Sequence, residues 1–338
     1  MRPAKSVVRF LLAALLTAAL TLPVLARSEV FVTNQDDATI SVIDTDSDTV
    51  IATIPVGFAP AGIAASRDGA EIYVTHPESG NVSVIEAATR KVARTLKVGG
   101  MPFGVAVGQA GNLFVGDWNE STVSVIDPRS GKLIRRLDVG RSPAGIVTNP
   151  AGSLVFIANR ESNSVSIINA TTFALVATLP VGEAPFALAV SPDSKRVYVA
   201  NVRNATLSVL SMKTLQPVAE VKVGAMPYGV TTTVDGARVL VANQSAGTLS
   251  VIDAETLQVI GEHKVGRFPE GLAAEPGGTK AYAANWFSGD VSVVDADTGE
   301  ELKRIKTGGG SRALVLVPAT ASDRAAVPHH AADAAVPP

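Results

Sequence analysis

The chain alternates short apolar runs with short polar turns. In the second copy of a repeating unit the apolar runs are residues 72–75, 82–85, 92–98 and 103–107. These runs are rich in β-branched and aromatic residues and lack the 3.6-residue period of a helix, so each one predicts a β-strand. Four such strands, separated by turn residues, predict that each unit is a small antiparallel sheet.

Three sequence markers repeat together along the chain. They are a tetrapeptide that first occurs as FVTN, a Ser-Val-Ile-Asp element and a Val-Gly or Thr-Gly pair. The interval between successive tetrapeptides is 42 residues five times and 41 residues once. A period of this size predicts a propeller or a solenoid, and four strands in each copy favour propeller blades. The seven tetrapeptides end at Asn34, His76, Asp117, Asn159, Asn201, Asn243 and Asn285.

The segments between the predicted strands contain residues that favour tight turns. Pairs such as Asp68-Gly69 and Asp235-Gly236 precede the tetrapeptides and suit tight hairpins with a positive φ. A proline follows the marker glycine by three residues in six copies, and Ser311 takes its place in the seventh. Each proline stiffens the passage into the next strand.

These elements carry a family resemblance. The tetrapeptide, the Ser-Val-Ile-Asp element and the Val-Gly-x-x-Pro element resemble the YVTN family of β-propellers over about residues 28 to 318. Members of that family occur among bacterial periplasmic and archaeal surface-layer proteins. They differ in what they do, so the resemblance predicts the fold more strongly than an activity.

The resemblance also implies an order of strands. The run after each proline is then innermost, the tetrapeptide is next and the Val-Gly run is outermost, so residues 313–317 form a leftover innermost strand. That strand must complete the blade begun by residues 30 to 57, because an open ring would expose unpaired edges. We expect an all-β, seven-bladed β-propeller with four-stranded blades, closed by the C-terminal strand joining the three N-terminal strands.

The two ends of the chain lack the repeat. Residues 1–26 combine three cationic residues, an apolar run and the small-residue ending Val-Leu-Ala, which predicts a signal peptide and export to the periplasm or the medium. A membrane anchor is the alternative, although the run is shorter than the roughly 20 residues of a span. We expect the propeller to occupy 27–318 and the Ala/Pro-rich segment 319–338 to be a disordered tail.

Composition narrows the classes of function. The chain has 29 Lys and Arg against 31 Asp and Glu, and removal of three cations with the signal leaves 26 against 31. This acidic balance does not favour a polyanion-binding protein. The absence of cysteine excludes disulfides, thiolate metal sites and a covalently attached c-type haem. We find no catalytic constellation, P-loop or dinucleotide fingerprint, so an enzyme is the less favoured class.

Aromatic and arginine residues gather in two sets of loops that share one face of the predicted propeller. One set follows the tetrapeptide and the other surrounds the Val-Gly pair. Aromatic planes beside guanidinium groups suit stacking, cation–π contacts and anion pairing. The predicted ligand- or partner-binding residues of these loops are Trp118, Trp286, Phe58, Phe268, Arg141, Arg267, Arg160 and Arg312.

Two tetrapeptides depart from asparagine at their last position. His76 and Asp117 stand there, and both are further candidate site residues. An asparagine or aspartate at this position suits a turn, whereas His76 could also bind a ligand or carry a proton. Phe103, Phe186 and Tyr228 share one repeat position, which leaves blade-top packing and ligand contact both open.

The leading hypothesis from the sequence is a non-catalytic periplasmic binding or scaffold propeller. It would need no cofactor, would be a monomer, and would present its aromatic face to a protein, a glycan or single-stranded nucleic acid. One alternative is an enzyme of the propeller lactonase or lyase type with a carboxylate-bound divalent metal. The other is a haem- or quinone-associated redox propeller, for which His76 is the only sensible axial ligand.

Overall fold

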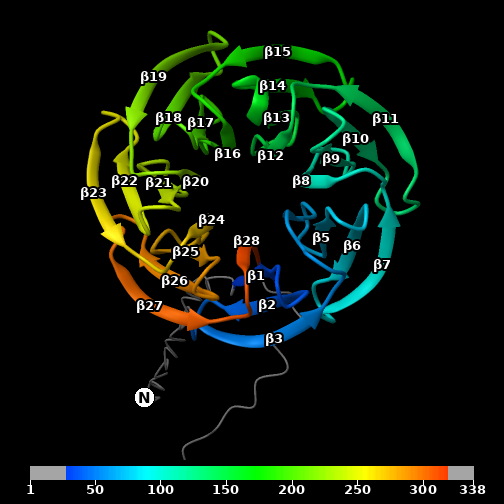
Figure 1. Ribbon diagram of the computed structural model, residues 1–338, viewed down its shortest axis with the longest axis horizontal. Helices are drawn as coiled ribbons and strands as arrows, with labels where there is room; N and C mark the ends of the chain where they lie inside the picture. Colours follow the sequence, from blue (N-terminus) through cyan, green and yellow to red (C-terminus); the bar gives the residue numbers. More distant parts are fainter. Residues whose placement is uncertain (1–27, 319–338) are drawn as a thin grey trace, which may run out of the picture.

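The computed structural model describes residues 28–318 of the 338-residue chain. The predicted signal segment and the predicted tail lie outside the described residues. Within 28–318 the strands form seven four-stranded antiparallel sheets arranged as a ring (Figure 1). The innermost strands line a central channel. The predicted all-β, seven-bladed propeller is therefore confirmed.

Every blade has the same strand order from the channel outward. The innermost strands are β4 (Ile63–Ala65), β8 (Pro102–Val107), β12 (Pro143–Thr148), β16 (Pro185–Val190), β20 (Pro227–Thr232), β24 (Pro269–Ala274) and β28 (Ser311–Pro318). The second strands are β1 (Ser28–Asn34), β5 (Glu71–His76), β9 (Leu113–Asp117), β13 (Leu154–Asn159), β17 (Arg196–Asn201), β21 (Arg238–Asn243) and β25 (Lys280–Asn285).

The outer half of each blade follows the same scheme. The third strands are β2 (Thr39–Asp44), β6 (Asn81–Glu86), β10 (Thr122–Ile126), β14 (Ser164–Asn169), β18 (Thr206–Ser211), β22 (Thr248–Asp253) and β26 (Asp290–Asp295). The outermost strands are β3 (Thr49–Pro55), β7 (Lys91–Lys97), β11 (Leu133–Asp138), β15 (Leu175–Pro180), β19 (Gln216–Lys222), β23 (Val259–Lys264) and β27 (Glu301–Lys306). A single 3₁₀ turn, Arg160–Ser162, interrupts the all-β pattern of the described residues.

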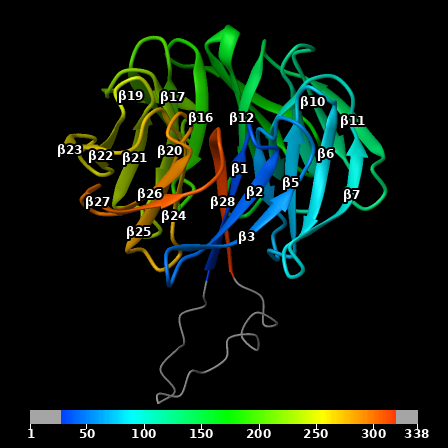
Figure 2. The same cartoon turned by 60° about the horizontal axis from the view of Figure 1, so that its bottom comes forward.

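The first blade is closed by the two ends of the described chain. Its strand order is β28-β1-β2-β3, and β28 pairs antiparallel with β1, with Val30 opposite Leu316 and Phe31 opposite Val315. Figure 2 shows β28 lying beside β1. The ring therefore has the predicted closure, in which pairing between distant segments removes two strand edges.

The turn chemistry agrees with the sequence prediction. Gly69 and Gly236 have φ of 71° and 73°, and Ser194, which replaces glycine in the fifth copy, also has a positive φ of 59°. These turns connect the innermost strand of each blade to the second strand on the face opposite the tetrapeptide loops. Local sequence therefore fixes these hairpins.

The apolar core lies between neighbouring blades. Aromatic side chains at the first tetrapeptide position are at most 2% exposed and belong to this core. Phe31, for example, packs in one cluster with Ile72 and Val74 of the next blade. These core aromatics are Phe31, Tyr73, Phe114, Phe156, Tyr198 and Tyr282.

The innermost strands approach one another too closely for side chains at some positions. A Cβ on Gly104 would lie 2.1 Å from the Ala144 carbonyl oxygen, and one on Gly229 would lie 1.9 Å from the Glu270 carbonyl oxygen. Glycine is required there because no side chain fits against the next backbone. The residue that precedes each of these glycines lines the channel instead.

Candidate functional site

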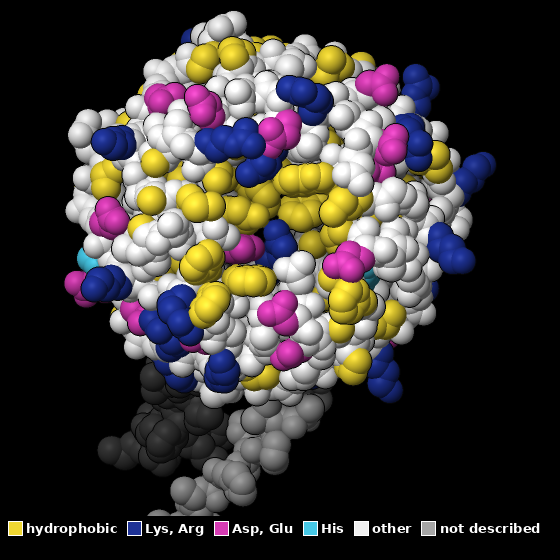
Figure 3. All heavy atoms as spheres, in the orientation of Figure 1, with side chains coloured by type: hydrophobic (Ala, Val, Ile, Leu, Met, Phe, Trp, Pro, Cys, Tyr) yellow, Lys and Arg dark blue, Asp and Glu magenta, His cyan; other side chains and the backbone are white. Residues whose placement is uncertain are grey.

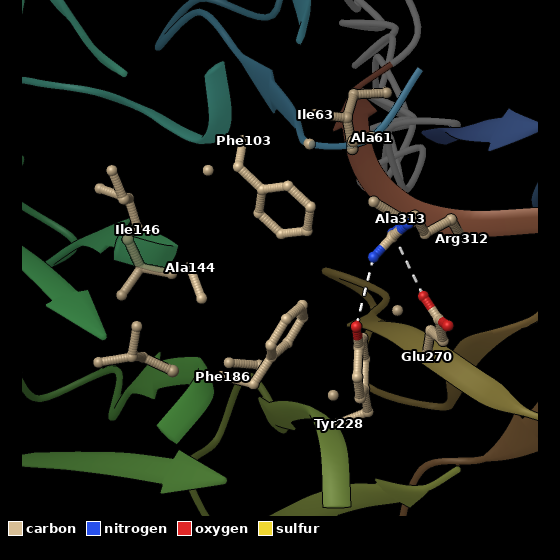
Figure 4. A pocket seen from close by; sticks show the side chains of 18 of the residues that line it. Ala61, Ile63, Phe103, Ala144, Ile146, Phe186, Tyr228, Glu270, Arg312 and Ala313 are labelled. Carbon is tan, nitrogen blue, oxygen red and sulfur yellow. Dashed lines mark hydrogen bonds and ion pairs between the residues drawn. The ribbon is translucent and has the colours of Figure 1, made fainter. Parts of the chain in front are cut away.

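Seven residues at one repeat position surround one end of the channel. Each follows the proline that begins an innermost strand, or its equivalent Ser311, and lies on the face that carries the loops after the tetrapeptides. All seven line a cavity of about 200 Å³ (Figure 4). We call them the channel-mouth ring: Ala61, Phe103, Ala144, Phe186, Tyr228, Glu270 and Arg312.

One arc of the channel-mouth ring is aromatic. The rings of Phe103 and Phe186 meet edge to face with centroids 5.7 Å apart, and those of Phe186 and Tyr228 are 3.8 Å apart. Trp118 covers this arc from the loop after β9, 4.9 Å from the Phe103 ring. Ala144 lies between Phe103 and Phe186 in the ring, and its small side chain leaves space for the contact. The arc presents flat apolar surfaces to the cavity.

The opposite arc carries a pair of charges. Glu270 is 7% exposed, and its Oε2 lies 3.3 Å from Nε of Arg312. The Glu270 Oε1 atom accepts a hydrogen bond of 2.7 Å from Gln244. Arg312 donates to Gln35 Oε1 at 2.8 Å and to the Tyr228 hydroxyl at 3.3 Å, and lies over the Phe103 ring. Figure 3 shows apolar side chains gathered around the central hollow, with a basic and an acidic side chain inside it.

Burial changes the acid–base chemistry of this arc. Burial raises the pKa of Glu270 above its usual range, while Arg312 and the Gln244 hydrogen bond oppose that rise. Burial also raises the pKa of Tyr228 to about 12, so its phenol is protonated at neutral pH. The cavity therefore contains one carboxyl group whose charge is costly and one phenol that stays neutral.

A second aromatic group lies at the edge of the same face. Phe287 packs 5.7 Å from Phe268 and 6.3 Å from Trp286, and the Arg267 guanidinium lies 4.4 Å over its ring. We call Arg267, Phe268, Trp286 and Phe287 the rim cluster. The Trp286 indole donates to Gln35 Oε1 at 3.2 Å, and this oxygen also accepts from Arg312. Gln35 thus joins the rim cluster to the channel-mouth ring.

Of the other two predicted arginines, only Arg160 contacts the Trp118 ring. Arg160 is 5.9 Å from the centroid of the Trp118 ring and forms an ion pair with Glu161. Arg141 donates to the Glu161 carbonyl oxygen at 2.7 Å. Phe58 is 62% exposed on the same face and has no ring contact within residues 28–318.

His76 and Asp117 are the last residues of their tetrapeptides and lie away from the cavity. His76 is 1% exposed, with Nε2 2.8 Å from the Ser83 hydroxyl and Nδ1 3.1 Å from the Phe58 carbonyl oxygen. Burial lowers its pKa, so the imidazole is held neutral. The Asp117 carboxylate accepts backbone N–H groups of Met101, Asn119 and Glu120 and fixes the turn. Neither side chain lines the channel mouth.

Sequence reasoning did not assemble the channel-mouth ring. It named Arg312 as a site residue and noted that Phe103, Phe186 and Tyr228 share one position, but it did not add Glu270 to them. The sequence does show that Glu270 belongs to this position, because Glu270 follows Pro269 as Phe103 follows Pro102. Aligning that position across all seven copies finds the whole ring.

Residues 28–318 contain no group of three or more His, Cys, Asp or Glu placed to hold a metal ion. Across the same residues, no helix is long and apolar enough to cross a membrane.

Comparisons with protein families match two parts of the chain. A model of YNCE-like β-propellers matches residues 14–112, and a model of the cytochrome D1 heme domain matches residues 149–270. The search of curated proteins found no match.

Solved structures share the fold at low sequence identity. Kuenenia stuttgartiensis hydrazine synthase is 18% identical, with a TM-score of 0.68 over 77% of this chain and 95% of that chain. A functionally unknown protein from Desulfotomaculum acetoxidans is 17% identical, with a TM-score of 0.75 over 85% and 98% of the two chains. The dihydro-heme d1 dehydrogenase NirN in complex with DHE is 19% identical, with a TM-score of 0.64 over 84% and 64%.

The match to the cytochrome D1 heme domain corrects the functional hypothesis. Sequence analysis expected a non-catalytic scaffold without a cofactor and kept a haem-associated propeller as an alternative. The matched segment favours the alternative over the leading hypothesis. The repeats, the seven closed blades and the YNCE-like match together identify the chain as a β-propeller repeat protein of the YVTN type.

Proposed function

We propose that this propeller binds a haem-type tetrapyrrole at the mouth of its central channel. One observation carries the proposal. The segment that matches the cytochrome D1 heme domain, residues 149–270, supplies Phe186, Tyr228 and Glu270 to the channel-mouth ring. The haem-related segment therefore contributes three of the seven residues of the channel-mouth ring.

The aromatic arc fits the flat ring of a tetrapyrrole. Phe103, Trp118, Phe186 and Tyr228 offer faces and edges for stacking. The cavity of about 200 Å³ is smaller than the roughly 300–1,000 Å³ of pockets that enclose a ligand. A macrocycle would therefore lie across the mouth, against the arc, with only a part of it entering the channel.

The face also offers cations for the acidic side chains of a tetrapyrrole. Neither Arg141 nor Arg267 forms an ion pair with a carboxylate within the described range 28–318. Both lie on the mouth face, where a guanidinium group binds a carboxylate with two parallel hydrogen bonds. The aromatic arc suits the flat apolar ring of a tetrapyrrole, and these arginines suit its carboxylate groups.

No histidine of the described residues lines the cavity, so none could bind the iron of a haem there. The two histidines within residues 28–318 are His76, buried between strands, and His263, on the outermost strand β23. Among the side chains that ligate haem iron, Tyr228 alone lines the cavity, and its pKa of about 12 keeps the phenol protonated. When bound, the tetrapyrrole supplies the conjugated ring and the redox chemistry of its metal, while the propeller holds the ring and its carboxylates.

The same proposal includes the periplasm as the site of action. It rests on the predicted signal peptide at residues 1–26. N-terminal sequencing of the mature protein from its native host tests this part, with Arg27 as the expected first residue.

Titration with iron(III) protoporphyrin tests the binding function. We expect a saturable shift of the Soret band and quenching of tryptophan fluorescence, since Trp118 adjoins the cavity. Phe103→Ala should weaken binding about fivefold or more, because stacking of a flat ring on an aromatic side chain is worth about 1–3 kcal/mol in nucleic-acid sites. The matched control is Phe173→Ala, a partly exposed phenylalanine at the turn between β14 and β15 on the opposite face. Absence of saturable binding, or equal losses in both variants, would overturn the proposal.

A further inference from the structure

The charged arc of the channel mouth contains an unused acceptor. Glu270 is 7% exposed, and its Oε1 is occupied by Gln244. Its Oε2 lies 3.3 Å from Nε of Arg312 but accepts no hydrogen bond. A buried carboxylate oxygen without a hydrogen bond is costly, and its retention calls for an explanation such as a bound ligand.

Unused donors lie beside this acceptor. An arginine has five N–H groups. Arg312 directs one from Nη1 to Gln35 and one from Nη2 to Tyr228, so each of these nitrogens retains a second N–H. Figure 4 shows Arg312 and Glu270 directed into the same cavity, with Phe103 and Phe186 on its other side. The cavity therefore offers donors and an acceptor within an apolar enclosure.

We propose that this cavity is a carboxylate-binding subsite that takes up a proton at Glu270 when the anion binds. The ligand carboxylate accepts hydrogen bonds from the free N–H groups of Arg312. Two carboxylates beside one guanidinium would repel each other, so one of them has to be protonated. Glu270 binds the proton at Oε2 and donates this O–H to an oxygen of the ligand.

The surroundings of Glu270 support proton uptake. Burial raises its pKa, and Arg312 on β28 is the cation that opposes this rise. Tyr228 on β20 faces the pair as a neutral phenol. Arg160, in the loop after β13, opposes the rise in the pKa of Tyr228. Gln244, after β21, contributes a neutral amide. A second anion beside Arg312 would raise the pKa of Glu270 further.

The size of the cavity indicates the class of ligand. About 200 Å³ admits a short aliphatic carboxylate but not a macrocycle. The carboxylate could come from a free short-chain acid or from an acidic side chain of the tetrapyrrole proposed above. The subsite rests on its own geometry, so it can be tested without the tetrapyrrole.

Calorimetric titration with butyrate tests the subsite. Titrations of the propeller between pH 5.5 and 8.0, in two buffers of different ionisation enthalpy, give the affinity and the protons taken up. We expect saturable binding at low pH and uptake of close to one proton for each butyrate at pH 8.0. Affinity should then fall about tenfold for each pH unit. Butyramide, which has the same shape without the charge, should bind at least tenfold more weakly.

Two substitutions separate the roles of the pair. Glu270→Gln mimics the protonated acid, so it should keep binding and lose both the proton uptake and the pH dependence. Arg312→Gln should lose binding at least a hundredfold. If Arg312→Gln misfolds, the double variant Glu270→Gln with Arg312→Gln removes both charges, and binding should still be lost. Absence of butyrate binding by the wild type, or an unchanged pH dependence in Glu270→Gln, would overturn the proposal.

A final comparison identifies the source of the carboxylate. If the subsite receives a tetrapyrrole side chain, protoporphyrin should compete with butyrate while its dimethyl ester should not. If it receives a free acid, butyrate and protoporphyrin should bind together. Both outcomes uphold the subsite and differ only in the natural ligand, whereas competition by the ester and the free acid alike would overturn a carboxylate-specific site.

Discussion

The last tetrapeptide position and the channel-mouth ring each contain one residue from every blade, but they differ in how uniform their residue types are. The last tetrapeptide position is asparagine in five blades, with His76 and Asp117 as exceptions, and all seven residues are at most 8% exposed. The channel-mouth ring contains alanine, phenylalanine, tyrosine, glutamate and arginine. Both sets come from the same repeat and lie on the same face, yet the second set varies far more in chemistry from blade to blade.

Six residues of the uniform set contact the serine seven residues later, whereas Asp117 accepts backbone N–H groups. In five blades the asparagine donates its side-chain N–H group to the serine seven residues later, as Asn201 does to Ser208 at 2.9 Å. His76 is 2.8 Å from Ser83, which occupies the same position. These contacts join the second strand to the third at the mouth face. Uniformity across the repeats therefore marks the fold, and variation across them marks the proposed binding site.

The largest effect should follow from opening the ring. Deleting residues 311–338 removes β28, which pairs with β1 and completes the first blade. We expect insoluble protein or loss of the cooperative unfolding transition, because an innermost strand is lost and two edges are exposed. Deleting residues 320–338 is the control and should leave the melting temperature nearly unchanged. A soluble, cooperatively folding 311–338 deletion would contradict the closure.

The next effect tests the uniform set directly. Asn201→Ala removes hydrogen bonds to Thr206 and Ser208 from a fully buried position. We expect a loss of about 1–3 kcal/mol in the free energy of unfolding, since the buried hydroxyl groups lose a partner. Urea unfolding measures it. A loss below about 0.5 kcal/mol would mean that the asparagines do not stabilise the blades.

A smaller effect is expected where histidine replaces asparagine. His76→Asn should keep the contact to Ser83, so stability at pH 7.5 should change by less than about 1 kcal/mol. The pKa of His76 is lowered by burial, so the unfolded chain binds a proton more readily than the folded protein. Wild-type stability should then fall as the pH drops below about 6.5. His76→Asn should reduce that fall in urea unfolding between pH 7.5 and 5. Equal pH profiles would exclude His76 as the cause.

The sequence predicted the fold well and the site only in part, for physical reasons. Hairpin turns such as Asp68-Gly69 and the strand pattern are local, and the leftover strand at 313–317 required the closure that β28 provides. The direction of a side chain depends on neighbouring blades instead. His76 was a candidate ligand because its burial cannot be deduced from one sequence. Glu270 was not named as a candidate, although its place after Pro269 directs it into the channel.

The smallest effect on stability should come from the channel-mouth ring itself. Tyr228→Phe removes the hydroxyl that accepts a hydrogen bond from Arg312 at 3.3 Å and keeps the ring that packs on Phe186. Arg312 retains its contacts with Gln35 and Glu270, so the guanidinium stays partnered. We expect a change of less than about 1 kcal/mol in the free energy of unfolding by urea, smaller than that of Asn201→Ala. A loss as large as that of Asn201→Ala would show that the channel-mouth ring also stabilises the fold, and variation across the repeats would then no longer separate site from structure.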